Sequence, residues 1–177
     1  MKIRVAAAQP LTFQKEREPE NLPVALDYIQ QAAEVGAHFI CFPEGYPGPY
    51  SGSMDFDPAD DLALAAKKHN IYVIAGGLEE AGSDAFYNLL DFYSPVGERI
   101  YRYRRCQSAG DGVDLPLFGR SVREGEELRV LETPYGNVGL QVCSEVFSPE
   151  MTRVLALDGA DVIFYPAGGM FYEISES

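Results

Sequence analysis

The sequence predicts an α/β fold in which a mixed sheet carries helices on one face and a second sheet on the other. Three observations predict it. Short apolar runs alternate with amphipathic helical patterns near both ends of the chain. Strand–turn–strand patterns without a helix interrupt this alternation in the middle. The strand-like runs are too continuously apolar for one face to meet water, so we expect a second sheet to cover the face without helices.

The amino-terminal half supplies three expected strands and two expected helices. Residues 3–8 form a β-rich opening run. Residues 21–35 place apolar side chains along one helical face, and a glycine follows as the stop signal. Residues 38–42 and 71–75 are continuous apolar runs, as expected for strands buried on both faces, and a Gly-Gly pair ends the second run. Residues 57–70 predict the helix between them.

The carboxy-terminal half begins with antiparallel pairing. Residues 86–104 and 128–142 each have the pattern of a β-hairpin, and a polar, glycine-rich loop over 108–123 separates them. Residues 148–159 predict a helix that opens with a hydroxyl N-cap and a proline and closes at a glycine. Residues 160–165 predict one more buried strand. The sheet should therefore combine parallel and antiparallel pairs.

Composition limits the classes of function. At 177 residues, the chain has room for one domain with a core and too little for two. A net charge of −13 with only 14 Lys and Arg residues repels phosphate backbones and anionic lipids, so neither nucleic acid nor a membrane surface is an expected partner. No run approaches the ~18 apolar residues of a membrane span, and the start is too quickly polar for a signal peptide. We therefore expect a cytoplasmic protein.

The cysteines and the missing motifs argue against a bound metal or cofactor. Cys41, Cys106 and Cys143 are widely spaced and form no CxxC pair, which disfavours a disulfide framework and a thiolate zinc site. The sequence has no P-loop, no dinucleotide-binding glycine motif after a strand and no HExxH pair. We expect no cofactor and a small molecule as the substrate.

Two residues stand where an open α/β sheet carries its chemistry, just past the carboxyl ends of strands. Glu44 follows the strand over 38–42, and Cys143 follows Leu-Gln-Val at 140–142. A cysteine at a strand end near a helix start lies among free backbone N–H groups, which favour the thiolate and can hold an oxyanion. A nearby carboxylate could take the thiol proton. The plainer alternatives are a solvated loop glutamate and a cysteine that only fills the core.

Several spaced motifs resemble the nitrilase superfamily of carbon–nitrogen hydrolases, in the correct order along nearly the whole chain. The first is Phe-Pro-Glu at 42–44, and the nucleophile segment at 139–150 reads GLQVCSEVFSPE. Residues 5–10 resemble the family's opening strand, and residues 97–103 resemble its hairpin into the third motif. The resemblance implies an α-β-β-α sandwich with helices outside, formed by one domain over residues 1–177. Family members are longer, so the carboxy-terminal part of the sandwich would be lacking.

The resemblance also implies site residues and a reaction. Cys143 takes the place of the attacking nucleophile, Glu44 that of the general base, and Arg105 stands where the family has a lysine that stabilises the tetrahedral intermediate. The backbone N–H of Ser144 could help to form the oxyanion hole, and Tyr46 could line the substrate pocket. The expected reaction is hydrolysis of a non-peptide carbon–nitrogen bond in a small amide, carbamoyl compound or nitrile through a cysteine acyl-enzyme.

Two departures from the family pattern bear on this expectation. Arg105 keeps the positive charge of the lysine but holds its proton permanently, and its fork could bind Glu44 bidentately. Its plainer alternative is a solvated residue at a strand end. The second active-site glutamate of many members is also missing; Phe118 stands about where it would be, and Asp111 or Asp114 could substitute for it.

Two further hypotheses remain at this point. The chain could be a non-catalytic relative that keeps the fold, or a fragment of a longer protein. Family members commonly associate through the helix after the nucleophile, which here carries Met151, Val154 and Leu155. We therefore expect a homo-oligomer, in which another chain could complete the sheets.

Overall fold

A computed structural model describes residues 2–51 and 53–168, and its main sheet runs in the order β1-β2-β3-β4-β5 with β6 beside β4. Strands β1, β2 and β3 pair in parallel, whereas β3, β4 and β5 pair antiparallel, so the expected mixed sheet is confirmed. The strands of this sheet are β1 (Val5–Ala7), β2 (Phe39–Cys41), β3 (Tyr72–Glu80), β4 (Ala85–Tyr93), β5 (Arg99–Arg104) and β6 (Ser121–Val122).

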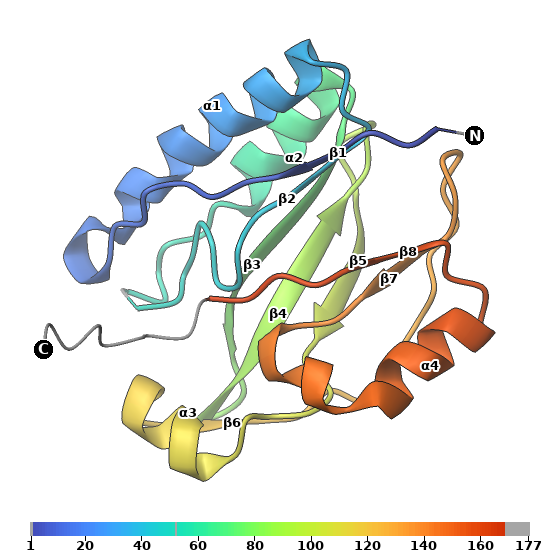
Figure 1. Cartoon of the computed structure of the whole chain (residues 1–177). Coiled ribbons are helices and arrows are strands. Elements are labelled where there is room, and N and C mark those ends of the chain that lie inside the picture. The colour runs from blue at the N-terminus through green and yellow to red at the C-terminus, as the bar shows by residue number, and fades with distance from the viewer. Residues whose placement is uncertain (1, 52, 169–177) are drawn as a thin grey trace, which may run out of the picture.

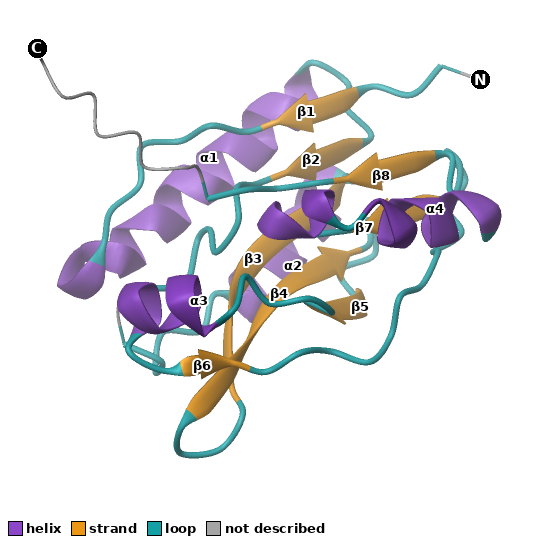
Figure 2. Cartoon of the chain, turned by 60° about the horizontal axis from the view of Figure 1, so that its bottom comes forward, coloured by secondary structure: helices purple, strands orange, loops and turns teal. Residues whose placement is uncertain are grey.

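The other elements form layers on either side of this sheet (Figure 1). Helices α1 (Asn21–Glu34) and α2 (Ala59–His69) cover one face. The parallel strands β7 (Val138–Leu140) and β8 (Val162–Phe164) cover the other face, and α4 (Pro149–Leu157) lies outside them (Figure 2). The expected second sheet is therefore present, and the layer order is α-β-β-α. The short helices are the 3₁₀ segments η1 (Lys15–Glu20) and η2 (Cys143–Phe147) and the α-helix α3 (Asp111–Phe118).

Two cores explain why the strands are apolar on both faces. Ile40 and Val73 point toward the helices and pack with Ile29 of α1. Their neighbours in sequence point to the other face, because side chains alternate along a strand, and there Phe39 packs with Phe164 of β8. Each large apolar side chain buried in this way contributes roughly 1.5–3 kcal/mol to folding. Two cores on one sheet therefore hold the layers together.

Strand β3 runs further than the sequence predicts. The Gly-Gly pair at Gly76 and Gly77 does not end the strand, which continues to Glu80. The two glycines instead let the chain after β2 approach closely, since a Cβ at Gly76 would lie 2.5 Å from the backbone nitrogen of Gly45. The Gly76 N–H donates to the carbonyl of Tyr46 at 2.8 Å. The pair therefore marks a close contact of the backbone, and the prediction of a strand end there was wrong.

Three further expectations for the second half need correction. The polar loop over 108–123 contains α3 and β6. The second expected hairpin is reduced to a bridge between Leu131 and Val138, and β7 pairs with β8 instead. The hydroxyl of Ser148 does not cap α4; it donates to the side-chain oxygen of Gln107. No helix among the described residues is long and apolar enough to cross a membrane.

Candidate active site

Glu44 lies past the end of β2 with its carboxylate buried and fixed at both oxygens. Oε1 accepts a hydrogen bond from Nδ2 of Asn88 on β4 at 2.7 Å, and Oε2 accepts one from the backbone N–H of Gly168 at 2.8 Å. Gly45, at φ +69°, turns the chain directly after the glutamate. The carboxylate therefore points away from the helices, toward the second sheet, and it is not a solvated loop residue.

Cys143 lies past the end of β7, at the first position of η2. Its φ is +48°, in the left-handed region that a residue with a side chain seldom adopts. Its N–H donates to the carbonyl of Pro166 at 2.9 Å, and the Tyr165 hydroxyl donates to its carbonyl oxygen. Strained backbone of this kind is typical of residues held in place for chemistry. The turn presents the half-buried thiol at the edge of the second sheet.

The thiol of Cys143 and the carboxylate of Glu44 meet across the gap between the two sheets. Burial, the negative charge of Glu44 and a side-chain hydrogen bond with it raise the pKa of Cys143 to about 11, against a lowering by Arg105. Cys143 is therefore a neutral thiol near pH 7 that faces a hydrogen-bond acceptor. A backbone hydrogen bond from Gly168 lowers the pKa of Cys143, as expected of N–H groups near the thiol, but burial and the facing carboxylate outweigh it.

Arg105 follows β5 and is only 2% exposed, so it is not a solvated strand-end residue. Its Nη1 lies 3.8 Å from Oε1 of Glu44, its Nε donates to the carbonyl of Gln107 at 2.7 Å, and its Nη2 donates to the hydroxyl of Ser144. The guanidinium therefore approaches Glu44 through one nitrogen and does not grip the carboxylate with both.

Asp114 is the acid of the two candidates that reaches this region. It lies on α3 and is 2% exposed, and burial and the charge of Glu44 raise its pKa while Arg105 lowers it. Asp111 is exposed and accepts a hydrogen bond from Ser121 at 3.2 Å. The side chain of Phe118 lies outside the described part of the structure. Of the two acids that the sequence left open, the structure therefore favours Asp114.

The structure does not bring Tyr46 to the site. Its ring stacks on Phe42 at a centroid distance of 5.5 Å, and its hydroxyl donates to the carbonyl of Asn21 at 3.0 Å, in the core beneath α1. Tyr50 of the same aromatic run comes to the site instead: burial and the charges of Glu44 and Cys143 raise its pKa. The position of Tyr50 follows from the turn at Gly45, which the residue types alone do not specify.

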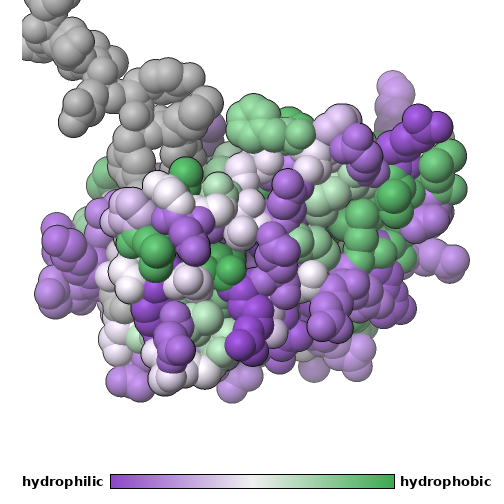
Figure 3. All heavy atoms as spheres, turned by 90° about the horizontal axis from the view of Figure 1, so that it is seen from below, coloured by the Kyte–Doolittle hydropathy of each residue, from purple (hydrophilic) through white to green (hydrophobic). Residues whose placement is uncertain are grey.

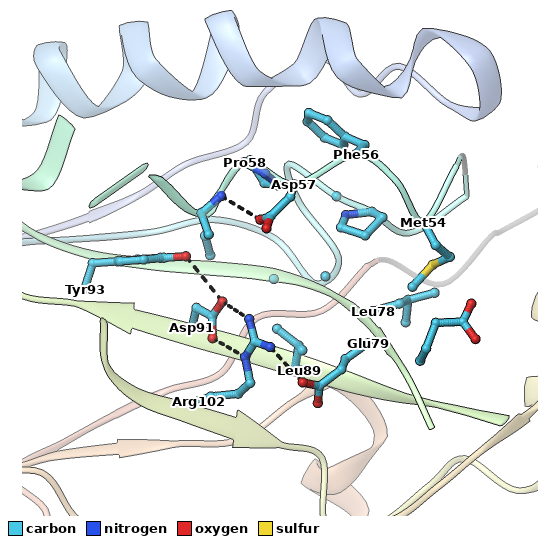
Figure 4. A pocket seen from close by; sticks show the side chains of 17 residues that line it. Met54, Phe56, Asp57, Pro58, Leu78, Glu79, Leu89, Asp91, Tyr93 and Arg102 are labelled. Carbon is cyan, nitrogen blue, oxygen red and sulfur yellow. Dashed lines mark hydrogen bonds and ion pairs between the residues drawn. The ribbon is translucent and has the colours of Figure 1, made fainter. Parts of the chain in front are cut away.

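A separate pocket lies on the helix side of the main sheet (Figure 4). Asp91 accepts hydrogen bonds from Nε and Nη2 of Arg102 at 2.8 and 2.7 Å. Nη1 of Arg102 donates to Glu79 at 2.9 Å. These charges pair with one another, and the lining includes none of the three residues named for catalysis. No group of three metal-ligating side chains occurs among the described residues.

The described geometry thus brings together a thiol, a carboxylate and a guanidinium from three segments far apart in sequence. These are the parts needed for a nucleophile, a base and an oxyanion stabiliser. The family model for carbon-nitrogen hydrolases matches residues 4–176. The chain belongs to the carbon-nitrogen hydrolase family.

The relatives of this member of the carbon-nitrogen hydrolase family include named amidases. Omega-amidase NIT2-B of Xenopus laevis is 27% identical over 161 residues, which cover 83% of this chain and 57% of the relative. Nitrilase homolog 2 of Dictyostelium discoideum is 25% identical, over 85% of this chain and 50% of the relative. The chain therefore spans between half and three-fifths of the length of these two relatives.

Solved structures share the fold. The amidase from Nesterenkonia sp. has a TM-score of 0.77 at 22% identity, covering 93% of this chain and 64% of that one. The carbon-nitrogen hydrolase from Helicobacter pylori G27 has a TM-score of 0.78 at 20% identity, covering 97% of this chain and 61% of that one. The expected α-β-β-α sandwich of the carbon-nitrogen hydrolase family is therefore confirmed, over the part of the fold that the chain spans.

Proposed function

We propose that the chain hydrolyses the carbon–nitrogen bond of a small amide through a thioester on Cys143. The observation that carries this proposal is the contact between the Cys143 thiol and the Glu44 carboxylate beside the buried guanidinium of Arg105. A protonated thiol next to an acceptor suits a step in which the proton leaves as the sulfur attacks. The amide is preferred to a nitrile because omega-amidases and the Nesterenkonia amidase are among the matched relatives and structures.

The first half of the reaction makes the thioester. The Cys143 proton passes to Glu44 while the sulfur bonds to the amide carbon, and the carbonyl electrons move onto oxygen. Arg105 and the backbone N–H of Ser144 stabilise this oxyanion. When the intermediate collapses, the carbon–nitrogen bond breaks, and the proton on Glu44 goes to the nitrogen, which leaves as ammonia or an amine.

The second half releases the acid. A water gives its proton to Glu44 and its oxygen bonds to the thioester carbon, and the carbon–sulfur bond then breaks. The sulfur recovers the proton from Glu44, and a carboxylic acid departs. Glu44 is therefore base and acid in turn, a role for which the hydrogen bonds from Asn88 and Gly168 hold it in one place.

Arg105 replaces the family lysine as a fixed positive charge in this scheme. Its two outer contacts, to Gln107 and Ser144, aim the guanidinium across the site. Asp114 and Tyr50 interact with the charge of Arg105, and in this scheme they line the substrate site. A permanently charged guanidinium suits oxyanion stabilisation and does not take part in proton transfer.

The direct experiment measures ammonia release by the purified chain with a panel of small amides and searches for the acyl-enzyme by mass spectrometry. We expect turnover, and a mass increase on Cys143 equal to the acyl group. Cys143→Ala should abolish both, whereas Cys106→Ala, which removes the half-buried thiol after Arg105 and keeps the backbone N–H, should keep them. Absence of ammonia and of any adduct with every amide would favour the alternative of a non-catalytic relative or a fragment.

We also propose that the chain works as a homo-oligomer in the cytoplasm, as a single domain. The exposed apolar side chains on η2 and α4 support association there: Val146, Phe147, Val154 and Leu157. In Figure 3, apolar residues gather at the right, the side on which α4 lies in Figures 1 and 2. Leu155 was also expected in this contact. It is fully buried and packs against Gly139, so its side chain is not at the surface. Three unpaired thiols suit a reducing compartment.

A further inference from the structure

Glu145 is a completely buried carboxylate that the proposed reaction does not use. It lies on η2, two residues after Cys143, and is 0% exposed. Burial raises its pKa, and hydrogen bonds from Tyr103 and from three backbone N–H groups lower it. A carboxylate is costly to bury unless several donors surround it. The position of those donors indicates what the group does.

The donors belong to two segments that are far apart in sequence. Oε2 accepts the N–H of Val142 at 2.6 Å, directly before Cys143. Oε1 accepts the N–H of Cys106 at 2.7 Å and that of Gln107 at 3.0 Å, directly after Arg105. One carboxylate therefore ties the backbone beside the thiol to the backbone beside the guanidinium.

Tyr103 adds a third attachment. Its hydroxyl lies 2.8 Å from Oε1 and 2.9 Å from Oε2 of Glu145, and the residue is on β5, two positions before Arg105. Arg105 is thus flanked on both sides by donors to the same carboxylate. Its own side chain binds the carbonyl of Gln107 and the hydroxyl of Ser144, which are parts of the two tied segments.

We propose that Glu145 is a positioning residue, which sets the distance between Cys143 and Arg105 so that both face one substrate carbonyl. The inference rests on the proposed function, because it assigns those two residues to the same reaction. An ordinary structural carboxylate would stabilise its own helix. Apart from Val142, the donors to Glu145 come from the segment around Arg105, and all of them flank one of the two reactive residues.

Loss of this link should affect the chemical step more than substrate binding. In Glu145→Gln the side chain keeps its size, but one oxygen becomes an NH₂ group that faces N–H donors and cannot accept from them. Displacement of a reacting group by about 1 Å costs about 100-fold in rate. We therefore expect kcat to fall about 100-fold while KM stays within about threefold.

The matched control is a second buried carboxylate on the opposite face of the main sheet. Asp91 is 6% exposed and binds Arg102 through both oxygens, away from the site (Figure 4). Asp91→Asn removes a buried negative charge and leaves Arg102 without that carboxylate, so it should lower the stability of the fold. It should leave kcat unchanged, because none of its partners adjoins Cys143 or Arg105.

The experiment compares wild type, Glu145→Gln and Asp91→Asn in two assays, with folding checked by circular dichroism. The first separates kcat from KM for amide hydrolysis. The second follows alkylation of Cys143 by iodoacetamide from pH 6 to 10, with the site identified by mass spectrometry. In wild type Glu44 assists the sulfur and the rate varies little with pH. In Glu145→Gln we expect the rate at pH 7 to fall and then to rise about tenfold per pH unit.

Each result decides the proposal. A folded Glu145→Gln variant with the kcat and alkylation profile of wild type would overturn it, and so would an equal loss of kcat in Asp91→Asn. If Glu145→Gln does not fold, Tyr103→Phe decides, since it removes one donor and keeps the ring; an unchanged alkylation profile there refutes the positioning role. If wild type hydrolyses no amide, the proposed function fails independently of this inference. The alkylation profiles then still test whether Glu145 positions Cys143.

Discussion

At the scale of single residues, the site depends on the proton of the Cys143 thiol. Cys143 is a thiol whose pKa is raised to about 11, so near pH 7 almost none of it is ionised. A nucleophile in that state needs a base within reach at the moment of attack. In the proposed reaction Glu44 is that base, and hydrogen bonds from Asn88 and Gly168 fix its position.

The pH dependence of thiol alkylation tests this arrangement. In wild type we expect the iodoacetamide rate at Cys143 to be nearly level from pH 6 to 9, because Glu44 removes the proton in the same step. Glu44→Gln removes the base together with two causes of the raised pKa, so the pKa of its thiol should be lower than in wild type, while burial still raises it. Its rate should then be low at pH 7 and increase about tenfold per pH unit up to that pKa.

The outcome that contradicts the arrangement is a Glu44→Gln profile that coincides with that of wild type across the whole range. Alkylation of the variant at high pH is itself expected. The informative comparison is therefore between wild type and variant in how steeply the alkylation rate rises with pH.

Arg105 gives the second test at this scale. Arg105→Lys keeps the charge, but one ammonium nitrogen cannot hold Gln107 and Ser144 while it also faces Glu44, and we expect kcat to fall about tenfold. Arg105→Met removes the charge and should lower kcat by roughly 10²–10³, the effect of removing an oxyanion donor.

Arg104→Lys is the matched control for these variants. Arg104 is the preceding residue on β5, but it is exposed and pairs with Glu79 at 2.6 Å, away from the thiol. It should retain wild-type kcat. Full activity in Arg105→Lys, measured as ammonia release, would mean that the outer contacts of the guanidinium do not matter and that charge alone suffices.

At the scale of elements, the turn after β2 decides which aromatic ring reaches the site. Gly45 has φ +69°, and a Cβ there would lie 2.0 Å from the ring of Tyr50. Gly45→Ala should therefore displace Tyr50 as well as strain the backbone. We expect a loss of about 1–3 kcal/mol in the free energy of unfolding and a higher KM for amides.

Gly82→Ala separates the two effects, since Gly82 has φ +102° and nothing lies within 4 Å of the position that a Cβ would take there. It should show the backbone strain alone, as a lower melting temperature with an unchanged KM. Thermal unfolding and steady-state kinetics of both variants make the comparison. An unchanged KM in Gly45→Ala would remove Tyr50 from the substrate pocket.

The sequence predicted the helices α1, α2 and α4, the β4–β5 hairpin and the positions of Glu44, Arg105 and Cys143, because periodicity and spaced motifs are local signals. It did not find Asn88 or Glu145, whose roles arise from contacts across the fold. The sequence signals Asn88 only as an amide within the largely apolar strand pattern over 86–93. Tyr46 and Tyr50 both follow Glu44 in the sequence, and residue types do not show which ring faces the site, because that depends on the geometry of the turn.

At the scale of the whole molecule, the second sheet is short. Two strands, β7 and β8, pair there within the described residues, against the longer main sheet. Exposed apolar residues on η2 and α4 lie on this side. A surface of this kind favours association, because burial of apolar area contributes about 25 cal/mol per Å².

A substitution on α4 tests the association. Leu157 is 74% exposed, and Leu157→Asp should shift the solution mass toward a single chain, since a charge in an apolar contact is costly. Leu64 on α2 is 65% exposed on the other side of the fold, so Leu64→Asp should leave the mass unchanged. Light scattering with size exclusion measures both; equal masses for wild type and Leu157→Asp would place the contact elsewhere.

The segment after β8 has a consequence for biosynthesis. The carbonyl of Pro166 receives the N–H of Cys143, and the N–H of Gly168 holds the second oxygen of Glu44. While the ribosome is still translating the codons before β8, neither attachment exists. The thiol and its acceptor therefore come together only after the nascent chain has been extended past this point, which keeps a half-made polypeptide from carrying an assembled nucleophile.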